Sequence, residues 1–219
     1  MQEKHGPFFQ ALKQRLEAPL PGPTAHQKMA SSVRSTAGYR TSPNEKTRQS
    51  AVLLLLYPYQ GELFLPLILR PAYDGVHGGQ VALPGGGYEK YDRTLIRTAL
   101  REAQEEIGIK ASDVRVLGQL TQIYIPPSNF QVQPVVGYLP YRPDFFPDIR
   151  EVADIIEISL ALLADKGIVG TKEMLVRNVL IQAPYYGVDT HTVWGATAMI
   201  LSEFLSVVEE IQTAGGETL

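Results

Sequence analysis

Two apolar runs that lie close together in the chain predict a β-hairpin. The first is AVLLLLY at residues 51–57 and the second spans residues 63–69, with the turn-forming sequence PYQGE between them. Pro66 in the second run favours an edge position for that strand, because proline lacks the amide hydrogen that a ladder needs. We therefore expect two strands to open a domain that begins near residue 50.

Further strands and two long helices are predicted downstream. Strand-like segments lie at residues 114–124, 132–139, 153–158 and 174–181, with a short helical segment near 160–164. Apolar residues at helical spacing predict helices over residues 94–107 and 194–211. Asp92 or Thr94 can cap the start of the first helix, and Gly108 suits its end. Strands that alternate irregularly with helices predict an α/β fold with a mixed sheet covered on both faces.

Charge is distributed unevenly along the 219 residues, whose formal net charge is −3. Residues 1–50 hold 8 basic and 3 acidic residues (+5), and residues 51–219 hold 12 basic and 20 acidic residues (−8). We expect residues 1–49 to form an N-terminal arm with a short helix, and residues 50–219 to form one domain. The acidic body argues against nucleic acid as a partner.

Composition excludes several further classes of protein. The chain has no cysteine, which excludes disulfides, thiolate metal sites and a cysteine nucleophile. Its longest apolar run is too short to cross a bilayer, and the N-terminal sequence MQEKHGPFFQ mixes charged with apolar residues. We therefore expect a cytoplasmic protein that does not interact with membranes.

Three carboxylates gather on the first predicted helix. Glu102 and Glu106 are four residues apart with Glu105 between them, so we expect all three on one surface, opposite the apolar stripe. Like charges at this spacing repel one another. Arg97 or Arg101 could balance them on a solvated face, or a hard cation such as Mg²⁺, Ca²⁺ or Mn²⁺ could bind there.

A glycine-rich sequence, PGGG at residues 84–87, comes directly before this helix. Glycines allow a tight backbone bend close to a ligand and leave amides free, although ordinary turns also use them. A glycine loop that leads into a helix rich in carboxylates predicts a site for a metal ion and a diphosphate.

These residues resemble the Nudix box, Gly-x5-Glu-x7-Arg-Glu-U-x-Glu-Glu-x-Gly-U with U aliphatic. The box belongs to Mg²⁺-dependent hydrolases that cleave nucleoside diphosphates linked to another moiety. Residues 101–109 match completely if Ala103 is accepted at the first U position. Upstream, Arg93 stands where the box has Glu, whereas Asp92 takes that role when the count starts from Gly86, so the loop is one residue longer. The resemblance implies the Nudix α/β/α sandwich with a mixed sheet.

Longer segments are similar to the coenzyme A pyrophosphatase branch of the Nudix hydrolases. They are LILRPAYDGVHGGQVALPGG at 67–86, TALREAQEEIG at 98–108, YIPPSNFQVQPVVGYL at 124–139 and WGATAMIL at 194–201. Leu83 replaces the usual Phe, and Pro71 follows the Arg. The resemblance implies hydrolysis of CoA or acyl-CoA to 3′,5′-ADP and (acyl-)4′-phosphopantetheine. The alternatives are another nucleoside diphosphate derivative, such as ADP-ribose, NADH or a dNTP, or a nucleotide-binding regulator without turnover.

The resemblance also implies roles for individual residues. Glu102, Glu105 and Glu106 are expected to bind Mg²⁺ or Mn²⁺, and Arg101 to orient one of them by an ion pair; all four are candidate catalytic residues. Either Glu102 or Glu151 could act as the general base.

Candidate substrate-binding residues lie outside the helix. Arg70 could reach a phosphate or form an ion pair at a strand end, and His77 could hydrogen-bond the substrate or cap its loop. Phe130 could stack on adenine or pack its loop, and the backbone of Gly85 and Gly86 could approach the diphosphate. Basic residues of the arm could contact the 3′-phosphate of CoA or the second subunit of a homodimer: Lys13, Arg15, Lys28 and Arg34.

Overall fold

A mixed β-sheet forms the centre of the structure. The computed structural model describes residues 5–32, 42–72, 78–176 and 179–215. The sheet contains β1 (Arg48–Tyr59), β2 (Glu62–Leu69), β3 (Val81–Ala82), β4 (Gly85–Gly87), β5 (Arg115–Gln119), β6 (Ile123–Ile125), β7 (Phe130–Tyr138) and β8 (Asp154–Ser159). Its order is β3-β2-β1-β7-β5, with β4 paired to β1, β6 to β7 and β8 to β2. The central pair, β1 and β7, is parallel and the other pairs are antiparallel, so the sheet is mixed.

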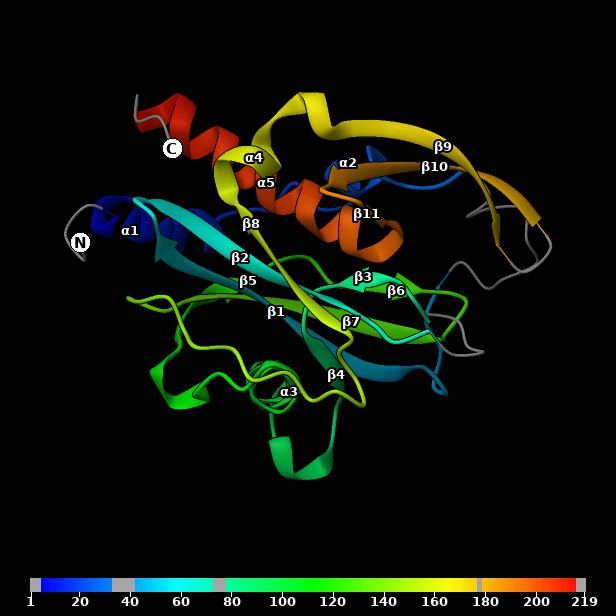
Figure 1. Ribbon diagram of the computed structural model, residues 1–219, viewed down its shortest axis with the longest axis horizontal. Coiled ribbons are helices and arrows are strands. Elements are labelled where there is room, and N and C mark those ends of the chain that lie inside the picture. The colour runs from blue at the N-terminus through cyan, green and yellow to red at the C-terminus, as the bar shows by residue number, and fades with distance from the viewer. Residues whose placement is uncertain (1–4, 33–41, 73–77, 177–178, 216–219) are drawn as a thin grey trace.

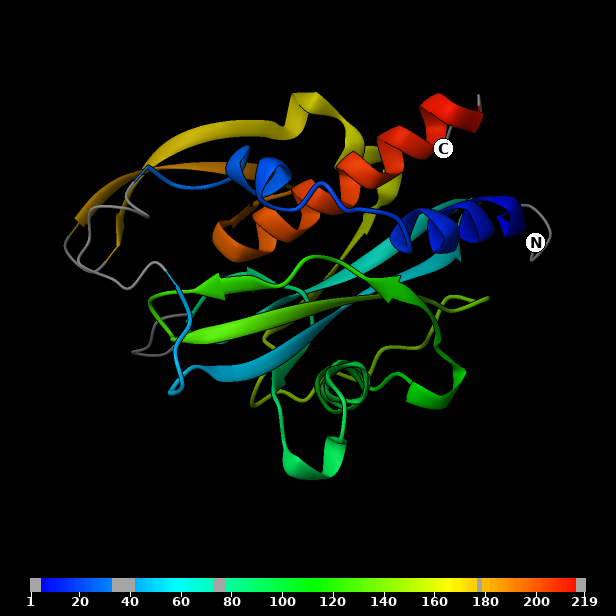
Figure 2. The same cartoon turned by 180° about the vertical axis from the view of Figure 1, so that it is seen from behind.

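Helices cover both faces of this sheet. One face carries α3 (Leu95–Ile107), and the other carries α1 (Gly6–Leu16) and α5 (Gly195–Gly215), with α2 (Pro23–Gln27) packed on α5 (Figures 1 and 2). Leu53 and Leu55 of β1 point into the core under α3, whereas Leu54 and Leu56 point into the core under α1 and α5. A strand buried on both faces explains the unbroken apolar run in the sequence. The predicted α/β/α sandwich with a mixed sheet is confirmed.

The predicted hairpin is confirmed, but the edge position of its second strand is wrong. Gln60 and Gly61 connect β1 to β2 with φ values of 50° and 86°, which fit a tight hairpin turn. β2 pairs with β1 and β3 along one side and with β8 along the other, so it lies inside the sheet. Pro66 is tolerated there because it lies between the segments that pair with β1 and with β3.

The remaining elements complete a second, smaller sheet. After the predicted short helix α4 (Leu160–Ala164) come β9 (Val169–Val176), β10 (Val179–Val188) and β11 (His191–Trp194), in the order β11-β10-β9. The single strand expected at 174–181 is wrong, because this segment spans the end of β9 and the start of β10, which pair as a hairpin. The apolar residues on both sides of the reversal made two strands resemble one.

The N-terminal segment packs into the same core as the rest of the chain. Phe9, Leu12 and Leu16 of α1 are buried in the cluster that includes α5, and the Phe9 ring stacks on Tyr138 at 4.0 Å between centroids. The division into an arm at 1–49 and a domain at 50–219 stays a prediction. Among the described residues, none of the helices is both long and apolar enough to span a membrane.

Candidate functional site

The helix that carries the carboxylates is fixed at both ends. Thr94 caps α3 by accepting the amide hydrogen of Arg97 at 3.2 Å, and Gly108 ends it with a left-handed φ of 73°. Ala99, Ala103 and Ile107 of α3 are fully buried beneath the sheet. The predicted helix, its cap and its end are confirmed, and burial of this face sets the direction in which the carboxylates project.

The sequence predicted that the three glutamates lie on one surface opposite the buried face of the helix. This prediction is wrong for Glu106. The Glu105 side chain is 55% exposed, whereas that of Glu106 is only 2% exposed. Glu106 follows Ala99 by seven residues and Ala103 by three, which places it at the edge of the buried face rather than opposite to it. The site therefore combines an exposed carboxylate with a buried one.

Glu106 lies in a polar niche between α3, β4 and the end of β2. Its Oε2 accepts the amide hydrogen of Gly85 at 2.7 Å, and its Oε1 lies 3.8 Å from Nη2 of Arg70. Burial is the main cause that raises the pKa of Glu106 to about 7; Arg70 and the Gly85 amide oppose this rise, and the charges of Glu102 and Glu151 add to it. The niche thus compensates the negative charge only in part and is suited to receive a cation.

The glycines of β4 allow α3 to approach the sheet closely. A Cβ on Gly86 would lie 2.5 Å from the carboxylate of Glu102, and one on Gly85 would lie 2.3 Å from the carbonyl oxygen of Ala51. A side chain at Gly85 would displace the backbone of β1, and one at Gly86 would displace the Glu102 carboxylate. The expectation of free amides is wrong for Gly85, because its N–H already binds Glu106.

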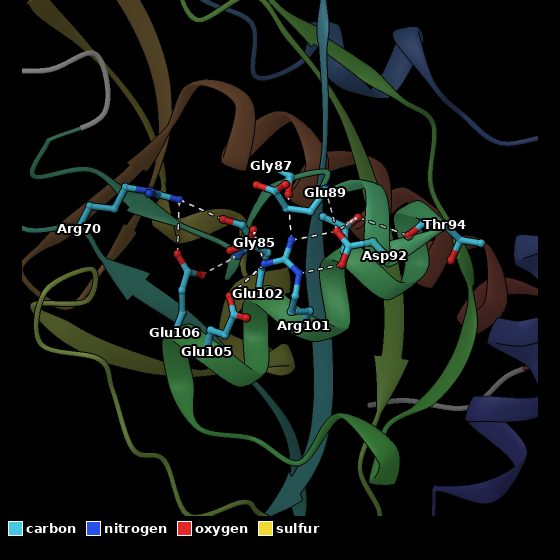
Figure 3. Close-up of polar contacts among 11 residues, drawn as sticks. Arg70, Gly85, Gly87, Glu89, Asp92, Thr94, Arg101, Glu102, Glu105 and Glu106 are labelled. Atoms are coloured by element: carbon cyan, nitrogen blue, oxygen red, sulfur yellow. Dashed lines mark hydrogen bonds and ion pairs between the residues drawn. The ribbon is translucent and has the colours of Figure 1, made fainter.

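Arg101 connects the glutamates to the turn that precedes the helix (Figure 3). Its Nε and Nη2 donate to the two carboxylate oxygens of Asp92 at 2.7 and 2.9 Å, and Nη2 also donates to the Gly87 carbonyl at 3.0 Å. Its Nη1 lies 2.9 Å from both Glu102 Oε1 and Glu105 Oε2. The guanidinium is therefore a shared counter-ion held in a fixed plane.

Asp92, which the count from Gly86 places at the acidic position of the box, is the partner that holds Arg101. Besides Arg101, it accepts the amide hydrogen of Glu89 and the hydroxyl of Thr98, both at 2.9 Å. The hydrogen bond from Arg101 is the main cause that lowers the pKa of Asp92 to about 2. Asp92 ends the turn η1 (Lys90–Asp92), after which Arg93 adopts a left-handed φ of 65°.

The structure brings only some of the other candidates to the glutamates. Arg70 reaches Glu106 and also donates to the Gly85 carbonyl at 3.3 Å. Phe130 packs against the core under α1 and α5, on the opposite face of the sheet from α3, and the Arg48 guanidinium lies 4.0 Å from its ring centroid. Of the basic arm residues, Arg15 and Lys28 bind α5, through Glu210 and Ser206. His77 and Arg34 lie outside the described residues.

The carboxylate oxygens of Glu102, Glu105 and Glu106 suit a hard divalent ion, although in this structure they bind Arg101 and the Gly85 amide instead. In the part of the chain that the structure describes, no three Asp, Glu or His side chains converge as metal ligands. Arg101 occupies Glu102 and Glu105 instead. Burial raises the pKa of Glu102, as it does for Glu106, and all ligands in reach are oxygens. Metal binding here requires a glutamate to leave Arg101 for the ion.

A surface hollow with a volume of about 700 Å³ lies between α1, α4 and α5. None of the residues of the glutamate cluster lines it. Charge and hydrogen bonding, rather than the size of a cavity, therefore locate the candidate site.

In this chain a helix with three glutamates and a paired arginine packs on a glycine-rich strand in an α/β/α sandwich. This arrangement is that of a Nudix-type protein. The NUDIX domain model matches residues 47–154. The chain is 37% identical over 171 residues to a protein of Pectobacterium atrosepticum named "Uncharacterized Nudix hydrolase NudL", covering 74% of this chain and 83% of the relative. The NudL of Yersinia enterocolitica is 51% identical over 110 residues, which cover 50% of this chain and 56% of that protein. The chain belongs to the Nudix hydrolase family.

A solved structure shares the fold. The MutT/nudix family protein from Enterococcus faecalis superposes with a TM-score of 0.53 at 18% identity, covering 81% of this chain and 71% of that one. At this identity the similarity concerns the fold alone.

Proposed function

We propose that this Nudix hydrolase cleaves the diphosphate of CoA or an acyl-CoA into 3′,5′-ADP and 4′-phosphopantetheine or its acyl form. The arrangement of Glu102, Glu105 and Glu106 around Arg101, next to β4, is the observation that supports hydrolysis of a diphosphate. The choice of CoA rests on the segments at 67–86, 124–139 and 194–201, which are similar to the CoA pyrophosphatase branch.

Nudix hydrolases generally use divalent metal ions. Glu102, Glu105 and Glu106 would hold Mg²⁺ or Mn²⁺ in this chain. A cation bound there neutralises the diphosphate and makes water a better nucleophile.

The protein's own groups supply binding, orientation and a proton acceptor. Arg70 lies at the rim of the niche with a partly exposed guanidinium, and it would bind a phosphate oxygen of the substrate. Asp92 fixes the plane of Arg101, which keeps Glu102 and Glu105 in place until they bind the ion. Either Glu102 or Glu151 would accept the proton of the attacking water.

A substrate panel tests the proposal directly. Hydrolysis of CoA, acyl-CoA, ADP-ribose, NADH and dNTPs is compared with Mg²⁺ or Mn²⁺, and CoA or acyl-CoA is expected to have the highest kcat/KM. A higher kcat/KM for another compound would refute CoA as the substrate but would still support the assignment as a hydrolase. Nucleotide binding without hydrolysis, even in Mn²⁺, would indicate a regulator. Light scattering of the purified protein, which measures its molecular mass in solution, tests the predicted homodimer separately.

Two variants test the roles of the glutamates. Glu105→Gln and Glu106→Gln remove a negative ligand while keeping the shape of the side chain, so both are expected to fold and to lose metal-dependent turnover. Wild-type activity in both would exclude these residues as metal ligands.

A further inference from the structure

Arg48, the first residue of β1, is held over an aromatic ring. Its guanidinium carbon lies 4.0 Å from the centroid of the Phe130 ring, and its Nη2 donates to the Ser128 carbonyl at 3.3 Å. Arg48 and Phe130 are direct neighbours on the parallel strands β1 and β7, and the Arg48 amide donates to the Asn129 carbonyl at 3.0 Å. Attraction between a guanidinium and an aromatic face favours one arrangement of the two groups. The Arg48 side chain is therefore fixed in place although the residue is exposed to solvent.

The loop beneath Arg48 is braced by Asn129. The side-chain Oδ1 of Asn129 accepts the hydroxyl hydrogens of Thr47 and Tyr124, at 3.0 and 2.9 Å, and its Nδ2 donates to the Lys46 carbonyl at 3.1 Å. Its backbone has a left-handed φ of 51°, which asparagine tolerates better than most residues do. These bonds join the segment before β1 to the segment before β7, so Arg48 rests on a fixed support.

The charge of Arg48 has no carboxylate partner. Within the described ranges, Arg48 takes part in none of the ion pairs. Five other arginines do pair with carboxylates: Arg15, Arg70, Arg101, Arg142 and Arg150. A guanidinium has several N–H donors in one plane, and only the bond to the Ser128 carbonyl engages those of Arg48. An oriented, unpaired guanidinium suits a phosphate, whose oxygens can accept several such bonds.

Arg48 lies close to the glycine strand that borders the glutamates. Ser50, two residues further along β1, pairs with Gly87 at the end of β4. Gln49 accepts the amide hydrogen of Tyr88, the residue after β4, at 3.0 Å. From the rise along a strand and the spacing between strands, the Cα atom of Arg48 lies about 8 Å from that of Gly87. This separation is within the length of one nucleoside.

The Arg48 side chain belongs to the face of the sheet opposite α3. Leu54 and Leu56, which follow Arg48 by an even number of residues, point into the core under α1 and α5, and Phe130 packs against the same core. Because Arg48 is the first residue of β1, its guanidinium lies where this strand begins. A ligand whose diphosphate lies at the glutamates would reach Arg48 by passing around the end of the sheet.

The chemistry of CoA requires a second site for phosphate at such a distance. Its 3′-phosphate is carried by the same ribose whose 5′-oxygen bears the diphosphate, so a cation that recognises the 3′-phosphate must lie within one nucleoside of the metal site. Of the basic residues that the sequence suggested for this phosphate, Arg15 and Lys28 bind α5 instead. Phe130 supports Arg48, which lies over its ring, rather than offering that face to adenine.

We propose that Arg48 binds the 3′-phosphate of the substrate and that Phe130 is the residue that positions its guanidinium. The inference rests on the proposed hydrolysis of CoA and names the residue that distinguishes CoA from 3′-dephospho-CoA. Neither residue takes part in the cleavage itself, so the effect belongs to KM rather than to kcat.

A comparison of CoA with 3′-dephospho-CoA tests the role of Arg48. Arg48→Gln removes the charge and is expected to raise KM for CoA about tenfold, with kcat and the KM for 3′-dephospho-CoA within about threefold of the wild type. Arg48→Lys keeps the charge without the planar donors and is expected to give a smaller rise. Arg115→Gln is the matched control, because Arg115 lies over the Tyr138 ring at 5.7 Å and donates to its hydroxyl at 3.1 Å, at the other end of β7.

A double variant tests the role of Phe130. Phe130→Leu is expected to raise KM for CoA and not for 3′-dephospho-CoA, and to cause no further rise in the Arg48→Gln background. Activity on 3′-dephospho-CoA shows in the same assay that each variant is folded. Wild-type KM for CoA in Arg48→Gln, or an equal rise for both substrates, would overturn the inference. A rise for both substrates in Phe130→Leu that persists in the Arg48→Gln background would reject the positioning role.

Inhibition by nucleotides gives a readout that does not depend on turnover of CoA. The inhibitors are 3′,5′-ADP and 5′-AMP, added to whichever diphosphate the wild type hydrolyses best. The wild type is expected to bind 3′,5′-ADP more tightly, and Arg48→Gln to remove the difference. Failure to hydrolyse CoA would refute the proposed substrate, whereas equal inhibition of the wild type by both nucleotides would refute the inference. Hydrolysis of CoA with equal effects of Arg48→Gln on CoA and 3′-dephospho-CoA would keep the proposed function and reject the role of Arg48.

Discussion

Glu203 of α5 provides the sharpest test of how the N-terminal segment is held. Its side chain is 0% exposed, and its carboxylate lies 2.9 Å from Nε2 of His26. It also accepts the amide hydrogen of Gly22 at 3.0 Å and that of Thr121 at 3.2 Å. One buried anion therefore joins three segments that are far apart in the sequence.

The expected cost of Glu203→Gln follows from these contacts. Glutamine keeps one acceptor oxygen and turns the other into an amino group that faces N–H donors. Leaving a buried donor without its acceptor costs about 1–3 kcal/mol. For a chain of 150–250 residues this corresponds to a fall in Tm of roughly 2–12 °C.

Calorimetry and urea unfolding of wild type and Glu203→Gln provide the measurement. Glu210→Gln is the control, because its pair with Arg15 is half exposed and is expected to contribute about 1 kcal/mol or less. A loss in Glu203→Gln no larger than that in Glu210→Gln would show that the buried network does not hold the segment.

The same network predicts a dependence of stability on pH. Burial alone would raise the pKa of Glu203, but the hydrogen bonds from His26 and Thr121 bring it below its usual value. A carboxyl whose pKa is lower in the folded state stabilises the fold above its unfolded pKa. That stabilisation is lost as the pH falls through the folded pKa. The wild type is therefore expected to lose more stability on acidification than Glu203→Gln does.

Other predictions concern the glutamate site. Gly86→Ala places a Cβ 2.5 Å from the Glu102 carboxylate and is expected to lower kcat by displacing that side chain, which steady-state kinetics will show. Arg101→Lys cannot reproduce the two bonds to Asp92 and is expected to lose about 1–3 kcal/mol of stability, measured by urea unfolding. Asp92→Asn is expected to destabilise the protein at neutral pH, with a difference from wild type that shrinks between about pH 4 and 2, because the Asp92 pKa of about 2 lies below its unfolded value.

The sequence was sufficient for the elements whose signals are local. The helix α3 was predicted with a cap at Asp92 or Thr94, of which the structure has Thr94, and with its end at Gly108, because a capping side chain and a left-handed glycine act within one turn of the helix. The β1–β2 hairpin followed from turn residues between two apolar runs. The resemblance to the Nudix box identified the family before any geometry was known.

Features that depend on contacts between distant segments could not be predicted in this way. Burial of Glu106 depends on β4, because the amide of Gly85 in that strand donates a hydrogen bond to the Glu106 carboxylate of α3. Helical spacing alone placed Glu106 with Glu102 and Glu105, opposite the apolar stripe. Pro66 predicted an edge strand, because the sequence shows only that this residue lacks an amide hydrogen. It does not show that β2 pairs with β1 before Pro66 and with β3 after it, which leaves a gap where no amide hydrogen is needed.

The bond between Gly22 and Glu203 also has a consequence for synthesis of the chain. The two residues are 181 positions apart, so the first helices leave the ribosome long before α5 exists. During that interval Phe9, Leu12 and Leu16 lack the α5 side of their core. Docking of α1 and α2 against α5 must therefore follow translation of residues 195–215, so the first helices wait for almost the whole chain before their core is complete.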